Sequence, residues 1–151
     1  MNRSPRRRAP RPRVRALPLA PTAAPADREP PPPDHISVDH ILIGVKSPSF
    51  PDGKRDAATA KTFAYDLLAK IRAGADWAKS KREHSEDPPP GGPYGLANRG
   101  VKPTGRGEYP RDQMVPAFGD VGFSLEVGAI GMADFDARTS PFGYHLIKRV
   151  S

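Results

Sequence analysis

The sequence predicts an α+β domain built around an antiparallel sheet. Three observations favour this class. A run of apolar, β-branched residues opens the folded part, two helical stretches separate it from the later strand candidates, and two neighbouring strand candidates close the chain. No internal repeat is present that would indicate a repetitive architecture.

The first strand is predicted over residues 35–45. Its β-branched content and its length suit a strand that is buried on much of both faces, so we expect it to be central in the sheet. Its buried side chains fall on both parities: Ile36, Val38, His40 and Leu42 on one, Ile41, Ile43 and Val45 on the other.

Two helices are predicted next. Over residues 56–73 apolar side chains recur at helical spacing: Ala60, Phe63, Ala64, Leu67 and Ile71. Gly74 can end this helix because it tolerates a positive φ. Asp76 is a predicted N-cap for a second helix over 77–84, which has few apolar residues and must be held by packing.

The second half of the chain is rich in turns. Residues 85–107 are predicted to be mostly loop because of their proline and glycine content, with one short strand at 94–97. A short helix is predicted over 114–123, with Pro116 in its first turn, where a missing N–H costs little. The last two strand candidates are residues 129–135 and 144–150.

Charge and proline are concentrated at one end of the chain. Residues 1–34 contain eight of the 24 Lys and Arg, three of the 17 Asp and Glu and ten of the 20 Pro. They carry +5 of the net charge of +7, so residues 35–151 are nearly neutral and no specific nucleic-acid surface is expected. We predict a disordered Arg/Pro-rich tail over 1–34 and one folded domain over 35–151.

The tail has three possible roles. It can be a solvated linker, a degenerate export signal that starts at residues 6–8, or a basic arm that touches nucleic acid or anionic lipid. Prolines interrupt the short apolar stretch after the arginines, which argues against an export signal. We favour the linker, and both the cytoplasm and the bacterial cell envelope stay open as compartments.

Several classes of site are excluded. The chain has no Cys, which rules out a disulfide framework, a cysteine zinc site and a thiol nucleophile. No run approaches about 18 consecutive apolar residues, so no transmembrane helix is expected. The histidines and acidic residues lack metal-ligand spacing, so we expect no metal.

Five short motifs then occur in order along the folded part. They are HILI at 40–43, GADW at 74–77, HSEDP at 84–88, MVPAF at 114–118 and FGYHLIK at 142–148. In this order the set resembles the parvulin-type peptidyl-prolyl cis/trans isomerases over about residues 35–150. The resemblance implies a four-stranded antiparallel sheet surrounded by about four helices, and isomerisation of X-Pro bonds without metal or cofactor.

The resemblance also implies an active site. Its polar members are His40, Asp87 and His145, with Ser140 near a hydroxyl position of the family. The implied walls of a proline pocket are Met114 and Phe118, Tyr94 or Leu96, and Phe142. We expect the two histidines to orient each other by hydrogen bonds, and Met114 and Phe118 to share a helical face through their i, i+4 spacing.

Departures from the family pattern keep a second function open. The chain has GPYG at 92–95 where the family usually has GDLG, and the segment after Asn98 up to Asp112 is several residues longer than usual. The alternative is therefore a chaperone or peptide-binding module with the same fold and little turnover. In either case we expect proline-containing polypeptide clients and a monomer.

Overall fold

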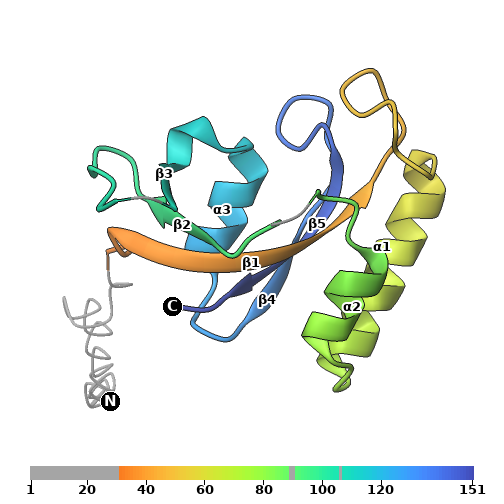
Figure 1. Ribbon diagram of the computed structural model, residues 1–151, viewed down its shortest axis with the longest axis horizontal. Helices are drawn as coiled ribbons and strands as arrows, with labels where there is room; N and C mark the ends of the chain where they lie inside the picture. The colour runs from red at the N-terminus through yellow and green to blue at the C-terminus, as the bar shows by residue number, and fades with distance from the viewer. Residues whose placement is uncertain (1–30, 89–90, 106) are drawn as a thin grey trace, which may run out of the picture. The chain divides into compact units, whose positions relative to one another are not determined.

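The computed structural model describes residues 31–88, 91–105 and 107–151, so most of the predicted tail lies outside the described residues. In this part of the chain five strands form one sheet in the order β3-β2-β1-β5-β4. The predicted α+β class is confirmed (Figure 1). The elements are β1 (His35–Gly44), α1 (Ala57–Arg72), α2 (Trp77–His84), β2 (Tyr94–Ala97), β3 (Glu108–Pro110), a 3-10 helix (Arg111–Gln113), α3 (Pro116–Ser124), β4 (Ile130–Ala133) and β5 (Gly143–Arg149).

The first strand, β1, lies at the centre of the sheet, as predicted. It pairs antiparallel with β2 through residues 35–38 and with β5 through residues 38–44, and β4 pairs antiparallel with β5. β3 runs parallel to β2, so the prediction of four antiparallel strands is wrong: the sheet has five strands and is mixed. β3 has three residues in a proline- and glycine-rich segment, too few to show an alternating pattern.

Helices cover both faces of this sheet. α1 and α2 pack on one face, where the side chains of Ile41, Ile43 and Leu146 join those of α1 in a hydrophobic core. α3 packs on the opposite face against Val38 and Ile147. The alternation of a strand sends successive side chains to opposite faces, so the two parities of β1 supply the two cores.

The ends of α1 follow the local rules that the sequence shows. The Asp56 carboxylate accepts a hydrogen bond from the Thr59 amide at 2.7 Å, which caps the first turn. At the other end Gly74 has φ +113°, and the Ala75 amide donates to the Lys70 carbonyl at 3.0 Å. This Schellman-type ending needs a residue that tolerates positive φ, so the predicted role of Gly74 is confirmed.

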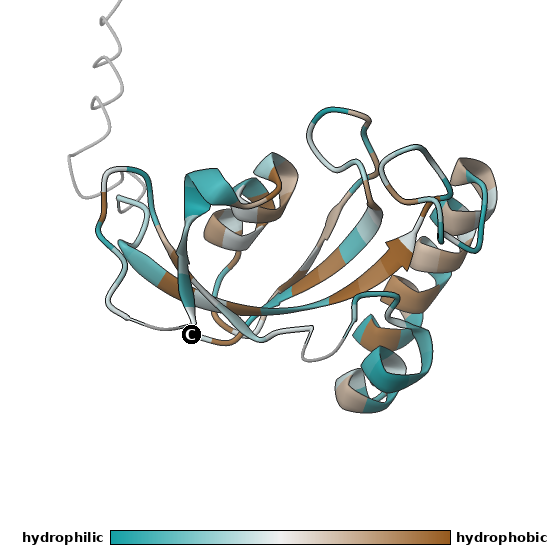
Figure 2. Ribbon diagram, turned by 45° about the horizontal axis from the view of Figure 1, so that its top comes forward, coloured by the Kyte–Doolittle hydropathy of each residue, from teal (hydrophilic) through white to brown (hydrophobic). Residues whose placement is uncertain are grey.

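The second helix, α2, depends on tertiary contacts, as its composition predicts. Figure 2 shows that it is mostly hydrophilic. Its first residue, Trp77, donates from Nε1 to Asp39 Oδ2 at 2.8 Å, and Lys81 Nζ lies 2.6 Å from Asp39 Oδ1. These two bonds attach the helix to β1 where apolar contacts are few.

The short helix α3 begins later than predicted. It starts at Pro116, because a residue that precedes proline is driven out of the helical region, and Val115 accordingly has φ −51° and ψ 125°. Met114 therefore lies before the helix, and the expected i, i+4 helical face with Phe118 does not exist. The described residues contain three α-helices, and the fourth helix is a single 3-10 turn.

Candidate active site

Two histidines lie close together on the α3 face of the sheet. His40 on β1 is 3% exposed and His145 on β5 is 5% exposed. Leu42 stands directly opposite His145, so the two histidines are diagonal neighbours on one face, with ring centroids 5.5 Å apart. Within the described residues neither ring nitrogen of His145 has a hydrogen-bond partner, so packing, not the expected mutual hydrogen bond, holds the pair.

The His145 ring is neutral near pH 7. Burial, together with the nearby His40, lowers the pKa of His145 from 6.5 to about 3. Desolvation disfavours the charged form of a buried imidazole, and a second positive charge beside it would add repulsion. His145 therefore contributes a polar but uncharged side chain to the site.

The segment after α2 docks on the edge of β1 that β2 leaves unpaired. Ser85 Oγ accepts from the Leu42 amide at 3.1 Å, and the Glu86 amide donates to the Leu42 carbonyl at 2.8 Å. The Glu86 carboxylate accepts from the Gly44 amide at 2.5 Å. These bonds attach Ser85 and Glu86 to the backbone of β1 around Leu42. Asp87, which follows Glu86, is therefore held beside the histidines.

The Asp87 carboxylate joins two aromatic side chains of the site. Its Oδ2 lies 3.2 Å from His40 Nε2 and accepts from the Tyr94 hydroxyl at 3.1 Å. The hydrogen bond from His40 outweighs the effect of burial and keeps the pKa of Asp87 below its usual value. Burial and the neighbouring Asp87 charge raise the pKa of Tyr94 to about 12. At neutral pH the site thus holds an ionised carboxylate and a protonated phenol.

A small pocket opens above these groups. Its volume is about 140 Å³, and it is lined by His40, Asp87, Tyr94, Met114, Val115, Phe118, Phe142 and His145. The Phe118 ring meets both histidine rings edge-on, with centroids 5.2 and 5.7 Å away. Pockets for whole drug-sized ligands are larger, about 300–1,000 Å³, so this one suits a single side chain or ring.

Seven of the nine residues expected at the site line this pocket, and two do not. Leu96 is fully buried in the core on the α3 face, so the wall contributed by β2 is Tyr94. Ser140 is also fully buried, and its hydroxyl donates to the Gly143 carbonyl at 2.8 Å, so it holds the turn before β5 instead of facing the pocket.

The sequence reasoning missed two residues of the site. Val115 lines the pocket, and Glu86 holds the backbone beside Asp87. Val115 could have been found from its place before Pro116, because the extended backbone that proline imposes separates it from the helix. The docking of Glu86 depends on which part of β1 lacks a partner strand, and no local pattern shows this. In the described part of the chain, no group of three His, Asp or Glu side chains could hold a metal ion.

The fold and this site together define a class: an α+β domain with a buried histidine pair, an ionised carboxylate and one small aromatic-lined pocket. Comparison with known families gives that class its name. The chain belongs to the PPIC-type PPIase domain family, whose model matches residues 26–150. This membership confirms the parvulin-type resemblance and the expected class of domain, a peptidyl-prolyl isomerase domain.

Individual relatives agree with the family match. The foldase protein PrsA 4 of Bacillus cereus is 30% identical over 113 residues, covering 75% of this chain and 30% of the relative. The peptidyl-prolyl cis-trans isomerase pin4 of Neurospora crassa is 34% identical over 113 residues, covering 74% and 66%. This chain therefore spans about a third of the PrsA relative and two thirds of pin4.

A solved structure supports the fold. The solution structure of TbPIN1 superposes with a TM-score of 0.58 at 16% sequence identity, covering 78% of this chain and 98% of that one. At this identity the likeness concerns the fold alone.

Proposed function

We propose that this protein accelerates cis/trans isomerisation of X-Pro bonds in flexible segments of proline-containing polypeptides. The observation that carries the proposal is the convergence of His40, His145 and Asp87 on one pocket with Met114 and Phe118. These residues come from β1, β5, the segments that follow α2 and precede α3, and α3 itself. The pocket has the size and the apolar walls to take one prolyl ring.

The proposed reaction needs no bond to be broken. The barrier of about 18–20 kcal/mol arises because conjugation gives the amide C–N bond partial double-bond character. A site that binds the twisted amide more tightly than the planar one lowers this barrier. The apolar walls hold the ring, and the chain can rotate about the C–N bond.

Asp87 supplies the electrostatic part of the proposed mechanism. The planar amide places more negative charge on its oxygen than the twisted amide does, because conjugation is lost on twisting. An ionised carboxylate beside the carbonyl therefore disfavours the planar form relative to the twisted one. Both bonds to Asp87 within the described residues go to Oδ2, which leaves Oδ1 for this interaction.

A peptide-binding module with little turnover is the second candidate. Tyr94 favours it, because its phenol bonds to Asp87 and its ring stacks on His40 at a centroid distance of 5.4 Å. A site filled in this way could hold proline without twisting the amide. A protease-coupled proline-peptide assay separates the candidates: the isomerase proposal fails if the folded protein gives no acceleration over the uncatalysed rate. Suppression of client aggregation by a wild type that gives no acceleration, lost in a Met114→Ala/Phe118→Ala variant, would favour the binding module.

We further propose that residues 35–151 form a monomeric isomerase domain and that residues 1–34 are a linker. The helices of the described residues are too short or too polar to cross a membrane. The backbone amide of Asn98 donates to the Asp34 carbonyl at 2.8 Å, so residues next to the domain should be kept. A tail-deleted variant should therefore begin at residue 31. Equal kcat/KM for this variant and the full chain, with a monomer mass by light scattering, is expected. Salt-sensitive DNA or lipid binding that disappears with the tail would contradict the linker.

A further inference from the structure

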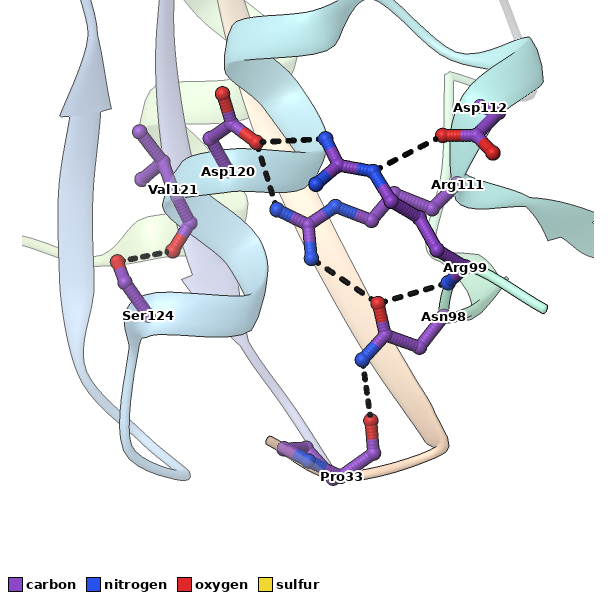
Figure 3. Close-up of polar contacts among 8 residues, drawn as sticks. All are labelled: Pro33, Asn98, Arg99, Arg111, Asp112, Asp120, Val121 and Ser124. Atoms are coloured by element: carbon purple, nitrogen blue, oxygen red, sulfur yellow. Dashed lines mark hydrogen bonds and ion pairs between the residues drawn. The ribbon is translucent and has the colours of Figure 1, made fainter. Parts of the chain in front are cut away.

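The long segment after Asn98 ends at a largely buried arginine. The side chain of Arg111 is 14% exposed. Its Nη2 donates to Asp120 Oδ1 at 2.6 Å and its Nη1 donates to Asn98 Oδ1 at 3.1 Å. Figure 3 shows the guanidinium group between α3 and the start of the segment. One side chain thus joins both ends of the extra loop to the helix that carries Phe118.

Arg111 also fits closely against the surface of α3. A Cβ atom at Gly119 would lie 2.8 Å from Arg111 Cγ, so the arginine occupies the space that any larger residue would need. The guanidinium carbon lies 4.7 Å from the centroid of the Phe123 ring. Apolar contact, a cation–π contact and an ion pair therefore fix this side chain on one helix.

The backbone of Arg111 contacts the second apolar wall of the pocket, Met114. The Met114 amide donates to the Arg111 carbonyl at 3.1 Å. Asn98, whose Oδ1 accepts from the arginine, donates from Nδ2 to the Pro33 carbonyl at 3.2 Å, two residues before β1. Arg111 therefore touches the segment that carries Met114 through its backbone and the helix that carries Phe118 through its side chain.

We propose that Arg111 is a positioning residue that sets the spacing between Met114 and Phe118, and so the width of the pocket. The proposal rests on the isomerase function proposed above. Arg111 does not line the pocket itself. A guanidinium has donors in fixed directions and can bridge two acceptors, which a flexible ammonium group cannot do equally well. A site that works by holding one small ring is sensitive to such placement.

The test compares Arg111→Met with Arg99→Met. Arg99 is a matched control, because it pairs with Asp112 at 3.2 Å and with Asp120 at 3.6 Å but its side chain is 62% exposed. We expect Arg111→Met to raise KM about tenfold with kcat within twofold, since the walls hold the ring in planar and twisted states alike. The KM of Arg111→Lys should lie between the values for the wild type and Arg111→Met. The KM of Arg99→Met should equal that of the wild type.

The alternative outcomes are distinct. Unchanged KM in Arg111→Met overturns the proposal, and so does a fall in kcat alone that follows the loss of folded protein, because that result indicates a purely structural role. The methyl NMR signal of Met114, one of three methionines in the chain, is a readout independent of turnover. It should shift in Arg111→Met and in Gly119→Ala but not in Arg99→Met. If the wild type shows no isomerase activity, the proposed function fails, and this signal alone decides whether Arg111 positions the wall.

Discussion

On the α1 face the buried side chains of β1 and β5 are Ile41, Ile43, Tyr144 and Leu146, whereas the α3 face carries His40 and His145 among its apolar residues. The same two strands supply both faces, and neighbouring residues differ only in parity. A continuous apolar layer stabilises the fold, and a layer interrupted by imidazoles loses part of that stabilisation. Both faces carry a core, and the difference indicates that the α3 face gives up part of its apolar layer to the site.

The largest expected effect is on the α1 face. Leu67→Ala removes a side chain that is buried against the sheet, and such changes cost about 2–5 kcal/mol of unfolding free energy. We expect a clear fall in the denaturation midpoint with unchanged activity per folded molecule. Chemical denaturation and the proline-peptide assay on the same sample measure both. A large loss of kcat in the folded variant would show that the faces are not separable.

The next effect is on the α3 side and concerns activity. Asp87→Asn keeps the size of the side chain but removes the charge beside the pocket, and we expect kcat/KM to fall about a hundredfold, the scale of losing one well-placed electrostatic group. Asp56→Asn is the control, because asparagine can also cap α1. Its activity should equal that of the wild type. Equal activity for Asp87→Asn would remove the carboxylate from the mechanism.

A smaller loss of activity is expected when the pocket wall Met114 is truncated. Met114 is partly exposed and lies outside α3, so Met114→Ala should lower kcat/KM about tenfold while changing stability little. Met132, a partly buried residue against the core on the α1 face, offers a matched control. Met132→Ala should show the reverse, with a stability loss and intact activity. The two variants, assayed together, test the comparison directly.

The effect that is smallest at pH 7 is on stability, and it changes with pH. The pKa of His145 is lowered to about 3, so between pH 6.5 and pH 3 the unfolded chain binds a proton that the folded one does not. Stability should therefore fall as pH decreases through this range, by at most about 1.4 kcal/mol per pH unit. His145→Leu should flatten this slope and raise stability at pH 7 by about 1 kcal/mol, because it removes a buried polar ring that has no hydrogen-bond partner among the described residues. Equal slopes in denaturation series at pH 5–7 would contradict this.

The elements predicted correctly are those whose signal is local. β1 shows dense β-branched apolar residues, and α1 has both helical periodicity and caps, with Gly74 in the required positive φ. β3 was missed because it is defined by its pairing with β2 and not by its own three residues. The start of α3 was misplaced by two residues although Pro116 marks it.

The site divides in the same way. The family resemblance predicted His40, His145 and Asp87, because each belongs to a short motif. It predicted the pocket walls Met114 and Phe118 for the same reason. It could not choose between Tyr94 and Leu96, which share one face of β2 and differ only in register. Tyr94 is paired with Val38, next to His40 along that face, whereas Leu96 is paired with Ile36 farther along the strand. Only the pairing of two distant strands decides this.

The docking of Ser85 and Glu86 on β1 also protects a strand edge, which matters if the protein acts on flexible chains as proposed. A row of unpaired backbone groups on a strand invites another chain to add to the sheet, which is a route to aggregation. Here Ser85 Oγ and the Glu86 carboxylate accept hydrogen bonds from the Leu42 and Gly44 amides of this edge. Under the proposed function, a client that brought its proline to the pocket would meet side chains there instead of an open strand, and could leave without being recruited into a growing sheet.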